Sequence, residues 1–107
     1  MKIVANTQQF DSATQSGRLV IADFYADWCG PCKAQGPILD ELSEELAGKV
    51  DIIKINVDEQ PELAARFGVM SIPTLVFFQN KELVGTAVGL QRKDALLTKV
   101  AMLQATN

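Results

Sequence analysis

The sequence predicts an α/β fold: a three-layer α/β/α sandwich in which a mixed five-stranded sheet is flanked by four helices. Residues 19–26 (LVIADFYA) are apolar on both alternating faces, which is typical of a central parallel strand covered by helices on both sides. Strand-like and helical segments alternate along the chain, and helical crossovers imply parallel strand pairs. Only Asn80 and Lys81 separate residues 74–79 from residues 82–88, which indicates an antiparallel hairpin at one edge.

The N-terminal residues predict a short strand and then a helix. Residues 2–5 (KIVA) are mostly apolar and fit a strand. Asn6 or Thr7 can accept the first free N–H groups of a helix over residues 7–16. Gly17 can adopt the left-handed backbone conformation that ends this helix.

A long helix is expected over residues 31–47, directly after the apolar strand. Pro37 lies inside it and should kink it, because proline has no backbone N–H for the preceding turn. Gly48 should end it. Its acidic residues lie mostly away from one apolar face. The residues of that apolar face are Ile38, Leu39, Leu42 and Leu46.

The second half of the chain completes the sheet. Residues 51–57 (DIIKINV) predict a third strand. A short helix follows over residues 61–67, with Pro61 in its first turn and Gly68 after it. Beyond the hairpin, residues 92–104 predict an amphipathic helix. The inward residues of this helix are Leu96, Leu97, Val100 and Leu103.

Composition limits the class of protein. A chain of 107 residues fits a single domain, and 48% hydrophobic with 21% charged residues is typical of a folded globular protein rather than a disordered one. The net charge of −3 provides no electrostatic attraction for nucleic acid or an anionic membrane. No segment reaches the ~18 apolar residues of a membrane span, and the N-terminus lacks the apolar core of a secretory signal. We therefore expect a cytoplasmic protein that binds neither nucleic acid nor membranes.

Both cysteines lie in one tetrapeptide, Cys29-Gly30-Pro31-Cys32, at the start of the long helix. Helical residues three apart have Cβ atoms about 5–6 Å apart, which is near the span of a disulfide. The unpartnered N–H groups and the dipole of the first turn stabilise a thiolate at Cys29, so its pKa should fall. Gly30 lets a partner's backbone approach, and Pro31 fixes φ where no N–H is needed. Cys32, one turn into the helix, should be less exposed than Cys29.

Three other roles for this pair compete with a redox-active dithiol. A zinc site would need two more soft ligands, and the chain has no histidine, so we expect no metal. A structural disulfide would close a loop of only four residues, worth ~2 kcal/mol, and disulfides are rare in the cytosol. Two buried structural thiols are the remaining alternative. The tetrapeptide favours a redox-active dithiol.

Residues 23–33 (DFYADWCGPCK), 71–74 (SIPT) and 88–89 (VG) resemble the thioredoxin family in order and spacing, so that the resemblance covers nearly the whole chain. Its Trp-Cys-Gly-Pro-Cys motif is highly specific. The resemblance implies a thioredoxin-like fold and a protein-disulfide reductase that uses a reversible Cys29–Cys32 dithiol/disulfide. Cys29 would be the nucleophile and Cys32 the resolving cysteine.

The same resemblance implies the partners and the source of electrons. A flavoprotein thioredoxin reductase would pass electrons from NADPH to this chain, and disulfide-containing proteins would be its substrates. No cofactor would be bound, and we expect a monomer. The alternative function is a thioredoxin-fold binding module or structural subunit of a larger complex, in which the dithiol is incidental. The intact Cys-Gly-Pro-Cys sequence favours the reductase.

Two charged residues interrupt apolar strands. Asp23 would be desolvated in a central strand, which would raise its pKa, although on an edge strand it would be an ordinary surface residue. The resemblance implies a buried aspartate that exchanges protons with Cys32. Lys54 could pair with Asp23 from the neighbouring strand, or it could simply face solvent.

The resemblance also implies a substrate-docking surface. An X-Pro bond is cis in only ~5–6% of cases, but thioredoxins hold a cis-proline beside the dithiol, at the position of Pro73. Its role there is to leave the Ile72 backbone free to pair with an extended peptide. We call the residues implied around Cys29 the docking surface: Trp28, Met70, Ile72, Pro73, Val88, Gly89 and Leu90.

Three residues depart from the common family pattern. Ser71 stands where glycine is frequent, and Tyr25 stands where tryptophan is common. Lys81 replaces the glycine of the usual Asn-Gly turn, so the sequence predicts a strained or different hairpin turn. None of the three departures alters the dithiol itself.

Overall fold

A computed structural model describes residues 1–105 of the chain, and these residues form the predicted α/β fold. The order of strands and helices is the one that the sequence predicts. In chain order, the elements are β1 (Lys2–Ile3), α1 (Thr7–Thr14), β2 (Leu19–Tyr25), α2 (Gly30–Glu45), β3 (Val50–Asn56), α3 (Pro61–Arg66), β4 (Thr74–Gln79), β5 (Glu82–Val88) and α4 (Lys93–Ala105).

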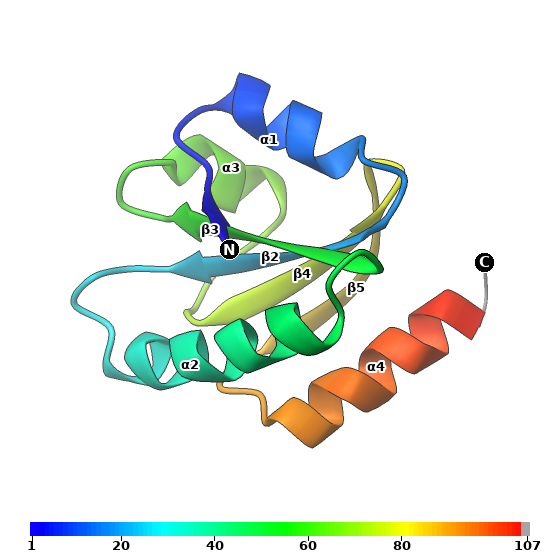
Figure 1. The fold of residues 1–107 in the computed structure, drawn as a ribbon. Coiled ribbons are helices and arrows are strands. Elements are labelled where there is room, and N and C mark those ends of the chain that lie inside the picture. The colour runs from blue at the N-terminus through cyan, green and yellow to red at the C-terminus, as the bar shows by residue number, and fades with distance from the viewer. Residues whose placement is uncertain (106–107) are drawn as a thin grey trace.

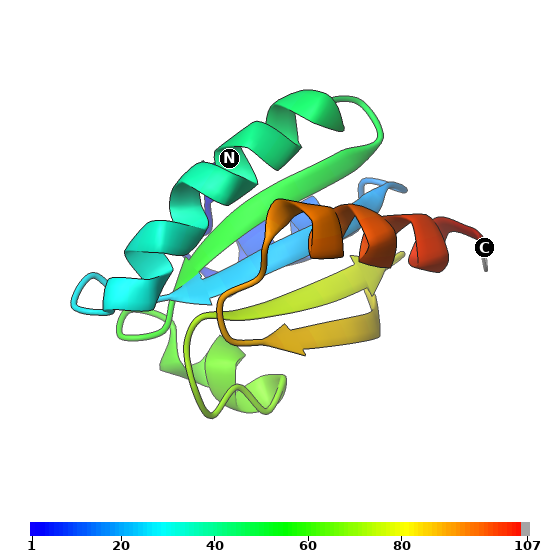
Figure 2. The same ribbon diagram turned by 90° about the horizontal axis from the view of Figure 1, so that it is seen from below.

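The described residues form one five-stranded sheet with strand order β1-β3-β2-β4-β5. The central strand β2 pairs in parallel with β3 and antiparallel with β4. Figure 1 shows α1 and α3 on one face of the sheet, and α2 and α4 on the other; Figure 2 shows α2 and α4 crossing that second face side by side. The predicted three-layer arrangement is therefore confirmed. Within residues 1–105, no helix is long and apolar enough to cross a membrane.

The two apolar faces of β2 pack into two separate hydrophobic cores. Val20, Ala22 and Phe24 pack into one cluster with side chains of α1 and α3. Leu19 and Ile21 pack into the other cluster with side chains of α2 and α4. Because alternate strand residues point to opposite faces, a strand that is apolar on both faces becomes the centre of the sheet.

Several element ends lie one or two residues from their predicted positions. The Asn6 side chain accepts the Gln9 N–H and caps α1, as the sequence predicts. Helix α1 nevertheless ends at Thr14 rather than at residue 16. There the Thr14 hydroxyl donates a hydrogen bond to the Phe10 carbonyl at 3.0 Å, and the Gln15 N–H donates to the Ser12 carbonyl. Helix ends depend on such side-chain and turn contacts, which hydrophobic periodicity does not reveal.

The turn between β4 and β5 keeps the geometry of an Asn-Gly turn without the glycine. Asn80 has φ 50° and Lys81 has φ 71°, so both central residues are in the left-handed region. This is the type I′ turn, whose twist matches that of a two-residue hairpin. The Lys81 N–H also donates to the Thr14 carbonyl at 3.2 Å. The predicted strain is therefore located at Lys81, which carries a Cβ at a position that favours glycine.

Replacing Lys81 by glycine is expected to stabilise the fold by about 1 kcal/mol, because glycine adopts a positive φ without steric cost. Urea unfolding at pH 7 measures the change. The reverse substitution, Gly48→Ala, is a matched control: Gly48 has φ +82° and nothing lies within 4 Å of an added Cβ. It should lose a similar amount. A Lys81→Gly variant that is less stable than the parent would contradict this account of the turn.

Candidate active site

The dithiol lies where β2 passes into α2. Cys29 has an extended backbone and is the N-cap of α2, and its Sγ accepts the Cys32 backbone N–H at 3.3 Å. The two residues are joined as a disulfide with their Cα atoms 5.3 Å apart, within the usual range for such bonds. The predicted disulfide-compatible spacing at a helix N-terminus is thus confirmed. In the reduced protein, this N–H and the helix dipole favour a thiolate at Cys29.

Residue exposure does not distinguish the two cysteines in the disulfide form, because both are buried. Cys29 is 4% exposed and Cys32 is 6% exposed. Both are covered because the bonded sulfurs sit among Tyr25, Val57 and Ile72. What distinguishes the two cysteines is the group that each one faces.

Cys29 faces the segment that carries the cis-proline. The Ile72–Pro73 peptide bond is cis, and the Ile72 carbonyl oxygen lies 3.8 Å from Cys29 Sγ. The Gly89 N–H donates to the Pro73 carbonyl at 2.8 Å, which places the residues after β5 beside the proline. The structure thus brings together three segments that are far apart in the sequence.

The side chains of this region leave apolar groups exposed. Trp28, Met70, Val88 and Leu90 are exposed large hydrophobic residues. Trp28, Met70 and Ile72 also line a cavity of about 340 Å³. Exposed apolar groups that converge on one place indicate a contact surface rather than random surface residues.

A hydrogen bond that the sequence does not reveal orients Trp28. Its indole Nε1–H donates to Asp58 Oδ2 at 2.8 Å, although the residues are thirty positions apart. Asp58 itself lies in the loop after β3, and its backbone N–H donates to Asn56 Oδ1. No local pattern in the sequence marks Asp58 as a residue of the site.

Asp23 is buried behind the dithiol. It is only 1% exposed, and among residues 1–105 its Oδ1 has no hydrogen-bond partner. Burial raises the pKa of Asp23 from 3.8 to about 6, and the charge of Lys54 acts in the opposite direction. Asp23 and Cys32 line the same cavity of about 250 Å³. The predicted burial and raised pKa of Asp23 are confirmed.

Lys54 lies directly opposite Asp23 in the pairing of β2 with β3. The described residues contain no direct ion pair between them; the Lys54 ammonium instead lies 4.4 Å from the centre of the Tyr25 ring. Both charged groups line the cavity behind Cys32. Lys54 therefore acts on the pKa of Asp23 through space rather than through a hydrogen bond.

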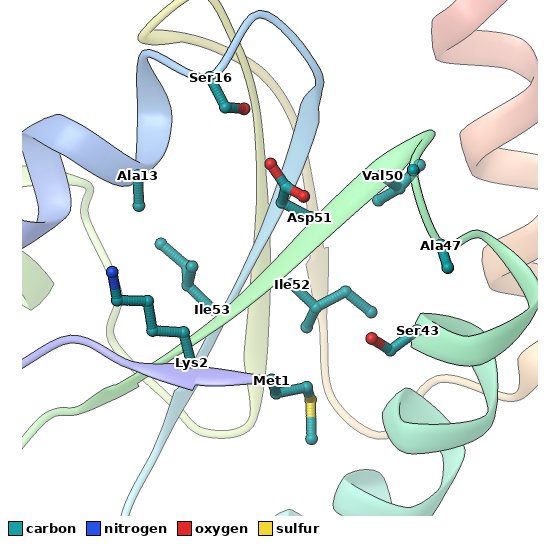
Figure 3. Close-up of a pocket in the computed structure, with 11 residues that line it drawn as sticks. Met1, Lys2, Ala13, Ser16, Ser43, Ala47, Val50, Asp51, Ile52 and Ile53 are labelled. Atoms are coloured by element: carbon teal, nitrogen blue, oxygen red, sulfur yellow. The ribbon is translucent and has the colours of Figure 1, made fainter.

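Another cavity, of about 450 Å³, lies away from the dithiol (Figure 3). It lies at the N-terminal end of β3, between the end of α1 and the end of α2, and no cysteine lines it. Its carboxylate, Asp51, is paired with Arg18 at 3.3 Å. The dithiol instead follows the carboxyl end of β2, the end at which open α/β sheets place their functional sites.

Comparison with known proteins identifies the family. The family model described as thioredoxin matches residues 1–102. The chain belongs to the thioredoxin family. Over 96 residues it is 51% identical to the thioredoxin of Bacillus subtilis (strain 168), covering 90% of this chain and 92% of that protein. Over 97 residues it is 50% identical to the thioredoxin of Staphylococcus haemolyticus, with the same shares covered.

Solved thioredoxin structures have the same fold. A mutant thioredoxin from Halobacterium salinarum NRC-1 superposes with a TM-score of 0.88 at 40% identity, covering 94% of this chain and 88% of that one. Plasmodium falciparum thioredoxin gives a TM-score of 0.87 at 36% identity, covering 95% and 98%. As a thioredoxin with Cys29 and Cys32 at disulfide distance, the chain is a thiol–disulfide oxidoreductase, that is, a protein-disulfide reductase that carries electrons.

Proposed function

We propose that residues 1–107 act as one domain in which Cys29 is the nucleophile and Cys32 the resolving cysteine. The observation that carries this assignment is the position of Cys29: it caps α2, receives the Cys32 N–H, and faces Ile72. The Cys29 thiolate attacks one sulfur of a substrate disulfide and releases the other as a thiolate. The Cys32 thiolate then attacks Cys29 Sγ and releases the second substrate thiolate. Two electrons pass to the substrate, and the protein is left as the Cys29–Cys32 disulfide.

Asp23 is assigned as the proton acceptor for Cys32. The resolving thiol must lose its proton before it attacks. Asp23 and Asp27 both line the cavity behind it, and Asp23 is the buried one of the two carboxyl groups. With a pKa of about 6, Asp23 is mostly ionised at pH 7 and can take up that proton. Lys54 adjusts this pKa from across the cavity. A cavity of this size admits water, through which the proton can pass.

Reduction of insulin disulfides tests the function against the alternative of a binding module. The reduced protein should convert insulin disulfides to thiols, with consumption of one Cys29–Cys32 dithiol for each disulfide. A protein that binds insulin or other partners without reducing them would support the alternative, in which the dithiol is incidental.

The docking surface is assigned to extended protein segments that contain a disulfide. The Ile72 backbone lies beside Cys29, where an extended chain can pair with it. Trp28, Met70, Val88 and Leu90, on the three segments that meet here, expose apolar side chains. Apolar contacts of this kind contribute affinity without specifying one sequence, as a reductase of many proteins requires.

A Val88→Ser substitution should raise the KM for a protein disulfide about fivefold, the effect of losing roughly 1 kcal/mol of apolar burial. Leu83→Ser is the matched control, because Leu83 is an exposed apolar residue at the other end of β5. The control should leave KM unchanged. Equal KM values for the two variants would argue against a docking role for Val88.

We infer that the disulfide form is reduced again by a flavoprotein thioredoxin reductase that takes electrons from NADPH, in the cytoplasm. Each turnover leaves the protein oxidised, so continued activity needs a donor of two electrons. In a mixture with NADPH and a bacterial thioredoxin reductase, one NADPH should be consumed for each insulin disulfide reduced. Absence of NADPH consumption, with insulin reduction intact under dithiothreitol, would show that another donor is used.

A further inference from the structure

Gln35 is a polar residue in the interior of the protein that the dithiol chemistry does not use. It lies on α2, three residues after Cys32, and its exposed fraction is 0%. A buried amide costs stability unless its hydrogen bonds are replaced within the protein. The hydrogen-bond partners of the Gln35 side chain therefore indicate its role.

Both hydrogen bonds of the Gln35 amide go to the backbone of one residue. The Gln91 N–H donates to Gln35 Oε1 at 2.8 Å, and Gln35 Nε2 donates to the Gln91 carbonyl at 3.1 Å. Gln91 lies between β5 and α4, at a sequence separation of fifty-six residues. Two bonds to one residue fix both the distance and the orientation of that segment relative to the dithiol helix.

The segment held in this way is the one that carries part of the docking surface. The Gln91 side chain Nε2 donates to the carbonyls of Val88 and Gly89 at 3.2 and 3.3 Å. At the other end, the Gly89 N–H donates to Pro73. Between these anchors, Val88 and Leu90 expose apolar side chains. Residues 88–91 are thus tied to α2 on one side and to the cis-proline segment on the other.

We propose that Gln35 is a positioning residue for protein substrates. Its amide holds residues 88–91 in place against α2, so that Val88 and Leu90 are ordered before a substrate arrives. A loop that is already ordered loses less conformational freedom on binding, and this lowers KM without altering the reaction of the sulfurs. The inference rests on the proposed docking role of Val88 and its neighbours.

Gln35→Met tests the proposal, because methionine has a similar length but cannot form either hydrogen bond. The KM for insulin should rise about fivefold, the effect of losing roughly one hydrogen bond, with kcat within about twofold of the parent. Hydrogen exchange of the Gln91 amide should accelerate at least about tenfold. Gln9→Met is the matched control. Gln9 lies on α1, which covers the face of the sheet opposite α2 (Figure 1), and its amide oxygen accepts the Ala5 backbone N–H. It should change neither quantity.

The double variant Gln35→Met with Val88→Ser separates the possible outcomes. If Gln35 acts through residues 88–91, the fold-increase in KM of the double variant will be smaller than the product of the fold-increases of the two single variants. If Val88→Ser raises KM while Gln35→Met accelerates Gln91 exchange without raising KM, Gln35 is only structural and the proposal is overturned, but the docking surface stands. If neither variant raises KM, both proposals are wrong. A fall in kcat at constant KM would place Gln35 in the chemical steps and also overturn the proposal.

A second variant carries the test if Gln35→Met does not fold. Gln91→Ala keeps the backbone groups that Gln35 binds but removes the two bonds to the carbonyls of Val88 and Gly89. Its KM should rise about threefold. An unchanged KM in this variant would overturn the idea that order in residues 88–91 governs substrate affinity.

Discussion

Cys29→Ser is expected to reduce protein-disulfide reduction by more than about 10³-fold, because it removes the attacking nucleophile. Cys32→Ser is expected to react once and then to remain joined to its substrate through Cys29, because the second thiol is absent. The physical basis is the N-terminal position of Cys29 on α2, where the Cys32 N–H contacts its sulfur. Turnover of insulin and mass spectrometry of the trapped adduct measure the two outcomes.

The reactivity of the two thiols provides an independent check on this assignment. In the reduced protein at pH 7, iodoacetamide should alkylate Cys29 faster than Cys32, because Cys29 is the N-cap of α2 and its sulfur faces the Cys32 N–H, which favours the reactive thiolate. Each single-cysteine variant isolates one thiol and serves as the control for the other. Equal alkylation rates, or an adduct that forms through Cys32 in the Cys29→Ser variant, would reverse the roles of the two cysteines.

The fold could be predicted because its main determinants are local. Residues of β2 alternate between two apolar faces, and this alone places the strand between two layers of helices. The spacing of apolar residues in α2 and α4 likewise indicates which side meets the sheet. Element ends were less predictable, since the end of α1 depends on hydrogen bonds that Thr14 and Gln15 make to the preceding turn.

The site was predictable where it is local in sequence and unpredictable where it is not. Cys29 and Cys32 are held three residues apart by one helix turn, and the burial of Asp23 follows from the strand around it. Trp28 and Asp58, by contrast, meet only because the loops after β2 and β3 end at the same edge of the sheet. In the sequence, Asp58 is an ordinary loop aspartate.

Two features of the site depend on information that the sequence does not contain. The near-equal burial of Cys29 and Cys32 belongs to the disulfide form, in which both cysteines pack against Tyr25, Val57 and Ile72. The contact of Lys54 with the Tyr25 ring depends on the side-chain conformation of Lys54. Strand register places Lys54 opposite Asp23, yet the long side chain can reach either neighbour.

Asp23→Asn is expected to stabilise the fold at pH 7 while it slows the release of reduced substrate. The carboxyl is buried, and its pKa is raised from 3.8 to about 6 because burial disfavours the charged form. The folded state therefore binds the proton more tightly than the unfolded state. Relative to a neutral residue, Asp23 costs nothing well below pH 4; its cost grows as the pH rises from about 4 through 6 and is complete above that.

The stability gain should follow that pH dependence. At pH 7 the shift corresponds to about 3 kcal/mol as an upper limit, since each unit of pKa is about 1.4 kcal/mol. Urea unfolding should show a gain of about 1–3 kcal/mol at pH 7, a smaller gain at pH 5 and none near pH 3.5. Asp51→Asn is the control, because Asp51 is a β3 carboxylate that is partly exposed and paired with Arg18. It should give no gain at any of these pH values.

The rate measurement separates a functional cost from a structural one. Asparagine has nearly the same shape as aspartate but cannot take the proton of Cys32, so the attack of Cys32 on the mixed disulfide should slow about tenfold or more. Single-turnover reduction resolves this step from the first attack by Cys29, which should keep its rate. Opposite changes in stability and rate are expected of a buried charge that is retained for chemistry. Lower stability with an unchanged rate would instead make Asp23 an ordinary structural group of β2.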